Sequence, residues 1–196
     1  MFGILFRDFL SVFFIGVIIK ILDDMIDAET DKILDKTNWW NAFGMGIIPY
    51  TFILFSLAVM LNKDLTVPLF LSAYVVGMGK EFNQKYLLGL PGWVESLLVI
   101  TTALFIFNWL NIFTSLAVLI AVQFIDDLLD YSQDRKTGEK NFAALLGFGE
   151  AFICLVILLT ALLFYSPYKL FLVMSAYLVI NLIIEKNYGK RLFRCS

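Results

Sequence analysis

Apolar runs of membrane-spanning length constrain the fold of this chain more than any other feature. Of its 196 residues, 60% are hydrophobic and 16% are charged, and the mean hydropathy is +0.83. An α-helix needs about 20 largely apolar residues to cross the hydrocarbon core of a bilayer. We therefore predict an all-α, multi-pass integral membrane protein, with one transmembrane domain over residues 1–196 and about seven transmembrane helices. The expected spans are about 2–22, 43–62, 65–80, 95–112, 113–127, 150–165 and 167–185.

Two clusters of acidic residues follow the first and the fifth of these runs. The first extends from Asp23 to Asp31 and the second from Asp126 to Asp134. Of the 17 acidic residues, 11 lie within 23–35 or 126–139. Concentrated negative charge beside a bilayer is unfavourable unless a cation neutralises it. The clusters therefore predict a cation site.

The two clusters repeat one another at a constant spacing of 103 residues. Ser72-Ala73-Tyr74 recurs as Ser175-Ala176-Tyr177 at the same spacing. We therefore predict two pseudo-repeats, about 10–90 and about 113–193, that face one another around a central cavity. The matching acidic pairs are Asp23 with Asp126, Asp24 with Asp127, Asp27 with Asp130, and Asp31 with Asp134.

The basic residues predict the orientation of the chain in the membrane. With seven spans, 12 of the 15 Lys and Arg residues lie on the same side as both acidic clusters. The other side holds Arg7, Lys63 and Lys169. Basic residues concentrate on the cytoplasmic side of membrane proteins. Both aspartate motifs are therefore expected at the cytoplasmic face.

The spacing of the aspartates favours magnesium and phosphate as ligands. Residues three and four apart share one face of a helix, so Asp24, Asp27 and Asp31 form an acidic stripe. Mg²⁺ prefers a few carboxylates together with water and phosphate oxygens. We predict that Mg²⁺ ions link the two stripes to one diphosphate, and that Asp24, Asp27, Asp127 and Asp130 are catalytic. The predicted metal ligands are Asp23, Asp24, Asp27, Asp31, Asp126, Asp127, Asp130 and Asp134.

Basic side chains near the clusters are expected to bind the same diphosphate and stabilise its charge as it departs. Their alternative role is to anchor the loops to anionic lipid headgroups. The chain has no histidine, so an imidazole base and the usual zinc ligands are excluded. No nucleic-acid partner is expected. The predicted diphosphate-binding residues are Lys32, Lys85, Arg135, Lys136 and Lys140.

These motifs resemble those of the UbiA superfamily of intramembrane prenyltransferases. The family's Asn-Asp-x-x-Asp-x-x-x-Asp motif is similar to residues 23–31, with Asp23 in place of Asn. Its second aspartate motif is similar to residues 127–134 and continues through Arg135 to Gly138, with Gln133 where Gly is common. A third element is similar to residues 81–91, in which Lys85 and Pro91 keep their spacing.

The resemblance covers about residues 10–190 and implies an activity. The implied reaction is Mg²⁺-dependent ionisation of an isoprenyl diphosphate inside a helical bundle, followed by prenyl transfer to an aromatic or other lipophilic acceptor. An allylic cation requires shielding from water, which an apolar chamber provides. Tyr74 and Tyr177 either line that chamber or form hydrogen bonds between helices.

Two alternative functions remain open from the sequence, and a third does not match its motif. A membrane terpene cyclase of the same superfamily needs the same metal site but no acceptor. A CDP-alcohol phosphotransferase requires a Gly after the first Asp, which neither cluster supplies. A divalent-cation carrier predicts acids near the middle of the membrane, whereas these acids lie at helix ends.

Overall fold

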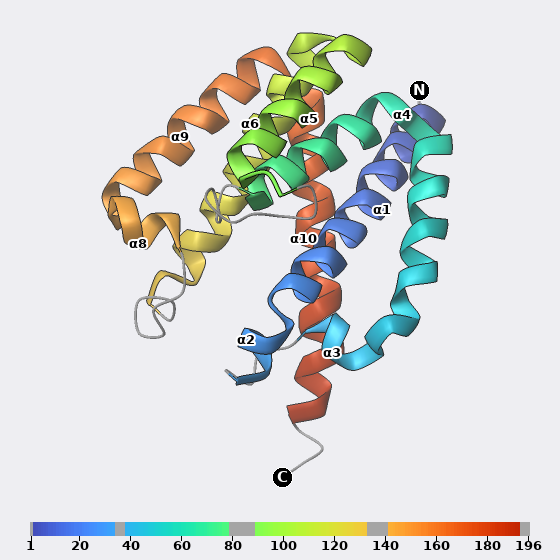
Figure 1. The fold of residues 1–196 in the computed structure, drawn as a ribbon, viewed down its shortest axis with the longest axis vertical. Helices are drawn as coiled ribbons and strands as arrows, with labels where there is room; N and C mark the ends of the chain where they lie inside the picture. Colours follow the sequence, from blue (N-terminus) through green and yellow to red (C-terminus); the bar gives the residue numbers. More distant parts are fainter. Residues whose placement is uncertain (1, 34–37, 79–88, 133–140, 193–196) are drawn as a thin grey trace. The chain divides into compact units, whose positions relative to one another are not determined.

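The protein is helical throughout the part of the chain that the computed structural model describes, residues 2–33, 38–78, 89–132 and 141–192 (Figure 1). These residues form α-helices and one short 3-10 helix, η1. In chain order the elements are α1 (Phe2–Ile26), α2 (Ala28–Ile33), α3 (Trp39–Phe43), η1 (Gly44–Ile47), α4 (Ile48–Met78), α5 (Gly92–Ile106), α6 (Trp109–Leu129), α8 (Phe142–Leu146), α9 (Phe148–Tyr165) and α10 (Pro167–Leu192).

The chain divides into two compact units, which are described separately. Unit 1 comprises Met1–Val67 and Leu172–Ser196, and unit 2 comprises Pro68–Phe171. In unit 1, α1 packs against α2 and α3, and Gly16 lets α1 approach α10 closely. A Cβ atom at that glycine would lie 2.8 Å from Ile180 Cδ1. In unit 2, α6 packs along α9, and α8 contacts both at their common end (Figure 1).

Four described segments are long and apolar enough to cross a membrane. They are Trp39–Gly77, Trp109–Leu129, Phe148–Tyr165 and Pro167–Ile184, and α5 is a shorter apolar helix. Helical segments overlap all seven expected runs, and α4 overlaps two of them. The expected boundary between the fourth and fifth runs, at 112–113, is wrong, because α5 ends at Ile106 and α6 begins at Trp109. The prediction of an all-helical protein with several helices able to span a membrane is confirmed in this coarser form. The count of seven membrane-crossing helices stays a prediction.

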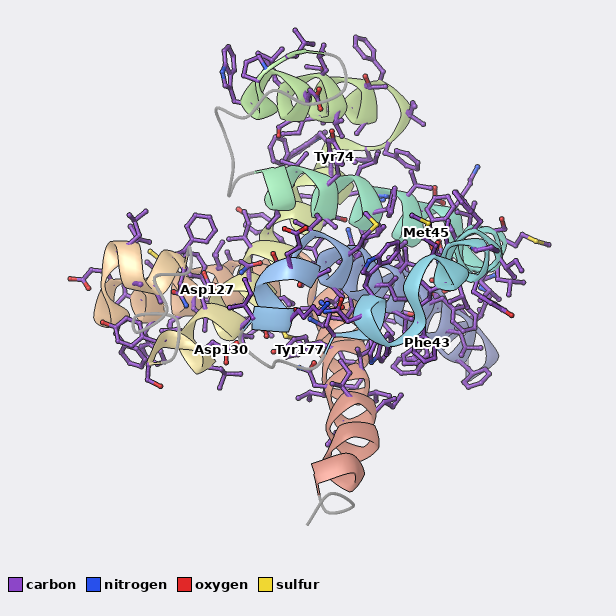
Figure 2. The ribbon with its side chains drawn as sticks, turned by 60° about the horizontal axis from the view of Figure 1, so that its bottom comes forward. Phe43, Met45, Tyr74, Asp127, Asp130 and Tyr177 are labelled. Atoms are coloured by element: carbon purple, nitrogen blue, oxygen red, sulfur yellow. The ribbon has the colours of Figure 1, made fainter. Side chains whose placement is uncertain are left out.

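Large apolar side chains cover the outer faces of these helices. On α9, Phe152, Ile157 and Phe164 are all exposed. Helix α3 ends in the exposed Phe43, and Met45 in η1 is exposed as well (both labelled in Figure 2). A soluble monomer rarely exposes contiguous apolar surface of this kind. The exposed faces are therefore consistent with a lipid bilayer environment.

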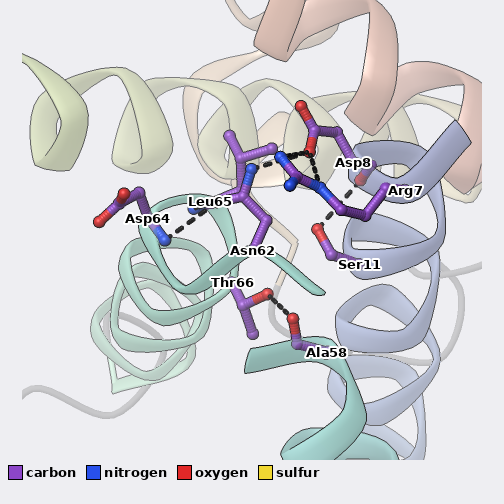
Figure 3. A network of polar contacts seen from close by, with 8 residues as sticks. All are labelled: Arg7, Asp8, Ser11, Ala58, Asn62, Asp64, Leu65 and Thr66. Atoms are coloured by element: carbon purple, nitrogen blue, oxygen red, sulfur yellow. Dashed lines mark hydrogen bonds and ion pairs between the residues drawn. The ribbon is translucent and has the colours of Figure 1, made fainter. Parts of the chain in front are cut away.

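Helix α4 bends sharply at Asn62, between the second and third expected spans. Asn62 has an extended backbone (φ −157°, ψ 95°) inside the helix. Its side-chain oxygen accepts hydrogen bonds from the backbone N–H groups of Asp64 (3.1 Å) and Leu65 (3.2 Å) (Figure 3). Asn62 thus caps the second limb of α4, because a side-chain oxygen at a helix start satisfies otherwise unpaired N–H groups.

The same asparagine ties the bend to the start of α1. Its side-chain amide donates to Asp8 Oδ1 at 2.9 Å, and the Arg7 guanidinium donates to the same oxygen at 3.1 Å and 3.2 Å (Figure 3). Asp8 is buried, with 6% of its surface exposed. A buried carboxylate needs such donors, because an unpaired buried charge is strongly unfavourable.

We expect Asn62→Ala to lower the free energy of unfolding by about 1–3 kcal/mol, because it removes both the cap and a donor to buried Asp8. Thermal unfolding of the purified protein in detergent measures this change. Lys63→Ala is the matched control, since Lys63 is exposed at the neighbouring position. Equal stability of the two variants would contradict the capping role of Asn62.

Candidate functional site

The first acidic cluster lies at the end of α1, where one of its aspartates is buried. Asp24 is 2% exposed, and its two carboxylate oxygens accept separate hydrogen bonds. The backbone N–H of Trp39 donates to Oδ2 at 2.7 Å. The Lys20 ammonium lies 2.9 Å from Oδ1. Asp24 therefore holds the first residue of α3 against the end of α1.

Asparagine 38 joins the two ends of this cluster. Its side-chain amide donates to the backbone carbonyl of Asp24 at 2.6 Å and to Asp31 Oδ2 at 2.7 Å. Its side-chain oxygen accepts from the backbone N–H of Asn41 at 2.9 Å, which caps α3. The sequence therefore folds the segment after Asp31 back onto the helix that carries the acids.

Burial raises the pKa of the Asp24 carboxyl, which lies beyond the expected span 2–22. The Lys20 ammonium and the Trp39 N–H oppose this rise in pKa. Desolvation always disfavours the charged form of an acid, whereas a nearby cation or a donated hydrogen bond favours it. Burial of Asp24 thus favours its neutral form, whereas Lys20 and the Trp39 N–H favour its charged form.

The second acidic cluster lies at the end of α6 and has the same local arrangement. Asp127 is 5% exposed, and its Oδ2 accepts from the backbone N–H of Phe142 at 2.8 Å. Its Oδ1 accepts from the side-chain amide of Gln123 at 2.7 Å. Asn141 donates to the backbone carbonyl of Asp127 at 2.8 Å and caps α8 through the backbone N–H of Ala144. Figure 2 labels Asp127 and Asp130 at this end of α6.

The two arrangements correspond residue by residue at the 103-residue spacing of the aspartates. In each, a buried Asp accepts the N–H of the first residue of a short helix, and an Asn before that helix donates to the Asp carbonyl. Each short helix ends at a glycine with positive φ, 59° at Gly44 and 109° at Gly147. Only glycine adopts such angles readily, so the chain can leave the short helix there.

The other aspartates differ from Asp24 and Asp127 in their exposure. Asp23 and Asp130 are exposed, and Asp27, Asp31 and Asp126 are half-buried. Helical hydrogen bonds continue through the first cluster, from Asp27 N–H to Asp23 (3.0 Å) and from Asp31 N–H to Asp27 (2.8 Å). Asp23, Asp27 and Asp31 are therefore spaced as successive helical turns. The predicted stripe instead begins at Asp24, which is buried.

The remaining predicted site residues lie outside these two local arrangements. Lys32 is exposed on α2 in unit 1. Asp23 to Asp31 belong to unit 1 and Asp126 to Asp130 to unit 2. Convergence of the two clusters on one ligand therefore stays a prediction. The predicted site residues that lie outside the described residues are Lys85, Asp134, Arg135, Lys136 and Lys140.

The described carboxylates suit a magnesium site that takes only one or two protein ligands. Among the described residues, no group of three or more His, Cys, Asp or Glu gathers as a metal site. Mg²⁺ does not need such a group, since it commonly takes one or two carboxylates and completes its octahedron with water and phosphate oxygens. The accessible acids Asp23, Asp27 and Asp130 fit that kind of coordination. A cage built from protein ligands alone is not formed by the described residues.

The two predicted tyrosines have different surroundings. The Tyr74 hydroxyl donates to Glu95 Oε2 at 2.7 Å, which links α4 to α5 within unit 2. The described contacts therefore give Tyr74 the helix–helix hydrogen bond that was one of its two expected roles. Tyr177 lies half-buried on α10 in unit 1. Its role in lining a chamber stays a prediction.

The sequence prediction missed the asparagines and glycines that recur in both arrangements. Asn38 and Asn141 share the 103-residue spacing, as do Gly44 and Gly147. Extending the comparison of the two halves beyond the acids would have found these pairs. Gln123 and Lys20 carry no such signal, because different residue types supply the second donor in each half.

Comparisons with protein-family models, with curated proteins and with solved structures find no match to this chain.

Proposed function

We propose that this protein is an intramembrane prenyltransferase that ionises an isoprenyl diphosphate with Mg²⁺ and transfers the prenyl group to a lipophilic, aromatic acceptor. The observation that carries the proposal is that the acidic residues and the hydrogen bonds around them recur together in both halves of the chain. Four aspartates, the Asn cap, the buried Asp contact and the terminal glycine all repeat at 103 residues. Duplicated membrane halves commonly build a shared site between matching motifs.

The proposal includes a topology. Seven helical segments cross the bilayer in two pseudo-repeats around a central cavity, and both clusters lie on the cytoplasmic side. The kink at Asn62 supports two crossings within α4, since an extended, capped residue separates its two limbs. The charge distribution of 12 basic residues against three supports the cytoplasmic orientation.

The residues divide into two roles in this proposal. The accessible acids, Asp23, Asp27 and Asp130 among them, bind Mg²⁺ together with the diphosphate oxygens. When bound there, Mg²⁺ would supply positive charge to the diphosphate leaving group. Asp24 and Asp127 position the short helices that follow each cluster, through the N–H groups of Trp39 and Phe142.

The basic residues of the cytoplasmic loops complete the proposed diphosphate site. Lys32, Lys85, Arg135, Lys136 and Lys140 supply positive charge near the two clusters in the sequence. Arg and Lys next to a transferring phosphate group stabilise charge where it develops. The apolar helices provide the water-poor surroundings that an allylic cation requires.

A product assay tests this function. Purified protein receives Mg²⁺ and a panel of isoprenyl diphosphates, with and without lipophilic aromatic acceptors, and products are identified by mass spectrometry. The proposal expects a prenylated acceptor only when Mg²⁺, donor and acceptor are all present. A hydrocarbon or alcohol formed from donor and Mg²⁺ alone would identify a terpene cyclase instead. Mg²⁺ flux into proteoliposomes with no consumption of diphosphate would identify a carrier.

A further inference from the structure

A lysine is buried in unit 2 at the ends of α6 and α10. Lys169 is 4% exposed, and its ammonium donates to the backbone carbonyl of Asn111, to Thr114 Oγ1 and to Ser115 Oγ, each at 2.9 Å. It also donates to Asn111 Oδ1. All four acceptors are neutral oxygens. Lys169 makes no ion pair within the described part of the chain.

A buried cation without a countercharge is unusual, and it is more unusual within a candidate membrane span. Charged residues are almost never fully buried unless they are paired. Lys169 lies within the candidate membrane span Pro167–Ile184. A charged side chain in such a segment is costly, and it commonly marks a binding site or pathway. Neutral oxygens satisfy the donors of the ammonium but leave its charge uncompensated.

The first half of the chain provides an internal comparison. Asp8 lies 103 residues before Asn111, and Ser11 lies 103 residues before Thr114. In unit 1 the Asp8 carboxylate pairs with the guanidinium of its neighbour, Arg7. In unit 2 the corresponding position holds the neutral Asn111. The second half therefore has a neutral amide where the first half has a carboxylate.

A cavity adjoins the uncompensated lysine. It has a volume of about 240 Å³ and includes Lys169 in its wall. Potential hydrogen-bond donors other than the ammonium also line it, namely the side chains of Asn108, Tyr165 and Ser166. The first turns of α6 and α10 contribute to the wall. Helix N-termini carry partial positive charge, so they add to the attraction for an anion.

We propose that this cavity binds a phosphate group, with Lys169 supplying the countercharge. A phosphate is small enough for the cavity, and its several oxygens suit three side-chain donors around one cation. The phosphate is either inorganic phosphate or the headgroup of a phospholipid, since both present the same oxygens. Within unit 2 this site lies at the opposite end of α6 from the acidic cluster, and it does not depend on the prenyltransferase proposal.

Two variants test the charge of the site in different ways. Lys169→Met removes the cation while keeping most of its length. Asn111→Asp keeps the cation and supplies the carboxylate that Asp8 supplies in the first half. Both should weaken phosphate binding at least tenfold, and Asn111→Asp should fold because it pairs a buried charge. Lys63→Met is the control, since Lys63 is an exposed lysine.

The experiment measures binding to the full-length protein in a detergent free of phospholipid. Inorganic phosphate is titrated at constant ionic strength with chloride as the reference anion, and thermal stabilisation is recorded. In parallel, native mass spectrometry compares retention of phosphatidylglycerol with that of diacylglycerol, which lacks the phosphate. Stabilisation by inorganic phosphate identifies the free ion, and selective retention of phosphatidylglycerol alone identifies the headgroup. In either case both variants must lose the effect and Lys63→Met must keep it. If neither probe binds the unmodified protein, or if Asn111→Asp binds as well as the unmodified protein, the proposal is wrong.

Discussion

Asp27→Asn and Asp130→Asn should each lower the turnover of prenyl diphosphate by about 100-fold or more. These acids lie at matching positions in the two clusters, and neither is fully buried. Metal-ion stabilisation of developing charge contributes several kcal/mol to a transition state, and each 1.36 kcal/mol is tenfold in rate. An amide has the shape of the carboxylate but lacks the charge that attracts Mg²⁺. The measurement is the initial rate of product formation at saturating Mg²⁺.

Glu29→Gln is the matched control for these two variants. Glu29 is an exposed acid on α2, in the same segment as the first cluster but outside the repeated aspartate pattern. Its substitution should leave the rate within about threefold of the unmodified enzyme, because a single exposed charge in high dielectric contributes little. Normal turnover by both Asp27→Asn and Asp130→Asn would remove the acids from the proposed mechanism.

Asp127→Ala should lower the free energy of unfolding by about 2–4 kcal/mol, because it leaves two half-buried donors without their acceptor. These donors are the Phe142 N–H and the Gln123 amide. Asp24→Ala should have a similar effect, through loss of the contacts with Trp39 N–H and Lys20. Thermal or denaturant unfolding in detergent measures both changes.

The neighbouring acids provide controls for this second prediction. Asp130→Ala and Asp23→Ala remove exposed carboxylates and should change stability by no more than about 0.5 kcal/mol. Asp127→Asn keeps one acceptor oxygen and should fall between Asp127→Ala and the unmodified protein. Equal stability of Asp127→Ala and Asp130→Ala would show that the buried Asp contacts do not hold α8 in place.

The two sets of variants have to be interpreted together. Loss of activity in Asp24→Ala or Asp127→Ala does not by itself identify a metal ligand, because these side chains also hold α3 and α8. Asp27 and Asp130 are the better test of metal chemistry, since their substitution leaves those contacts intact. Within each cluster, substitution of the buried Asp should therefore lower stability, and substitution of Asp27 or Asp130 should lower activity alone.

The approximate positions of the helices were predictable because their physical cause is local, although the break between α5 and α6 was placed several residues too late. Each apolar run is long enough to form a helix, and the polar residues between 62 and 65 interrupt the longest one. The bend falls at Asn62, whose side chain both caps a helix and reaches Asp8. The contact with Asp8 was not predictable, because it depends on which helix lies beside the bend.

The acidic residues of the candidate site were predictable from the sequence, but the hydrogen bonds that hold them in place were not. Regular spacing identified the aspartates, whereas the division between buried and exposed acids depends on how the chain folds back after each cluster. Asn38 and Asn141 direct that return, and each looks in sequence like an ordinary loop residue. Lys169 could be assigned to a membrane side by counting charges, but its burial follows from the packing of α10 near Asn111.

The most direct test of the central claim is the binding of a non-reactive prenyl thiodiphosphate, measured by calorimetry with and without Mg²⁺. A site shared by the two clusters predicts one ligand per chain, strict dependence on Mg²⁺, and a loss of affinity of at least about tenfold in Asp27→Asn and in Asp130→Asn separately. The double variant should bind little more weakly than either single one, because residues acting on one ligand are not additive. Undiminished affinity in either single variant, or two independent binding events per chain, would contradict the claim that both clusters bind the same diphosphate.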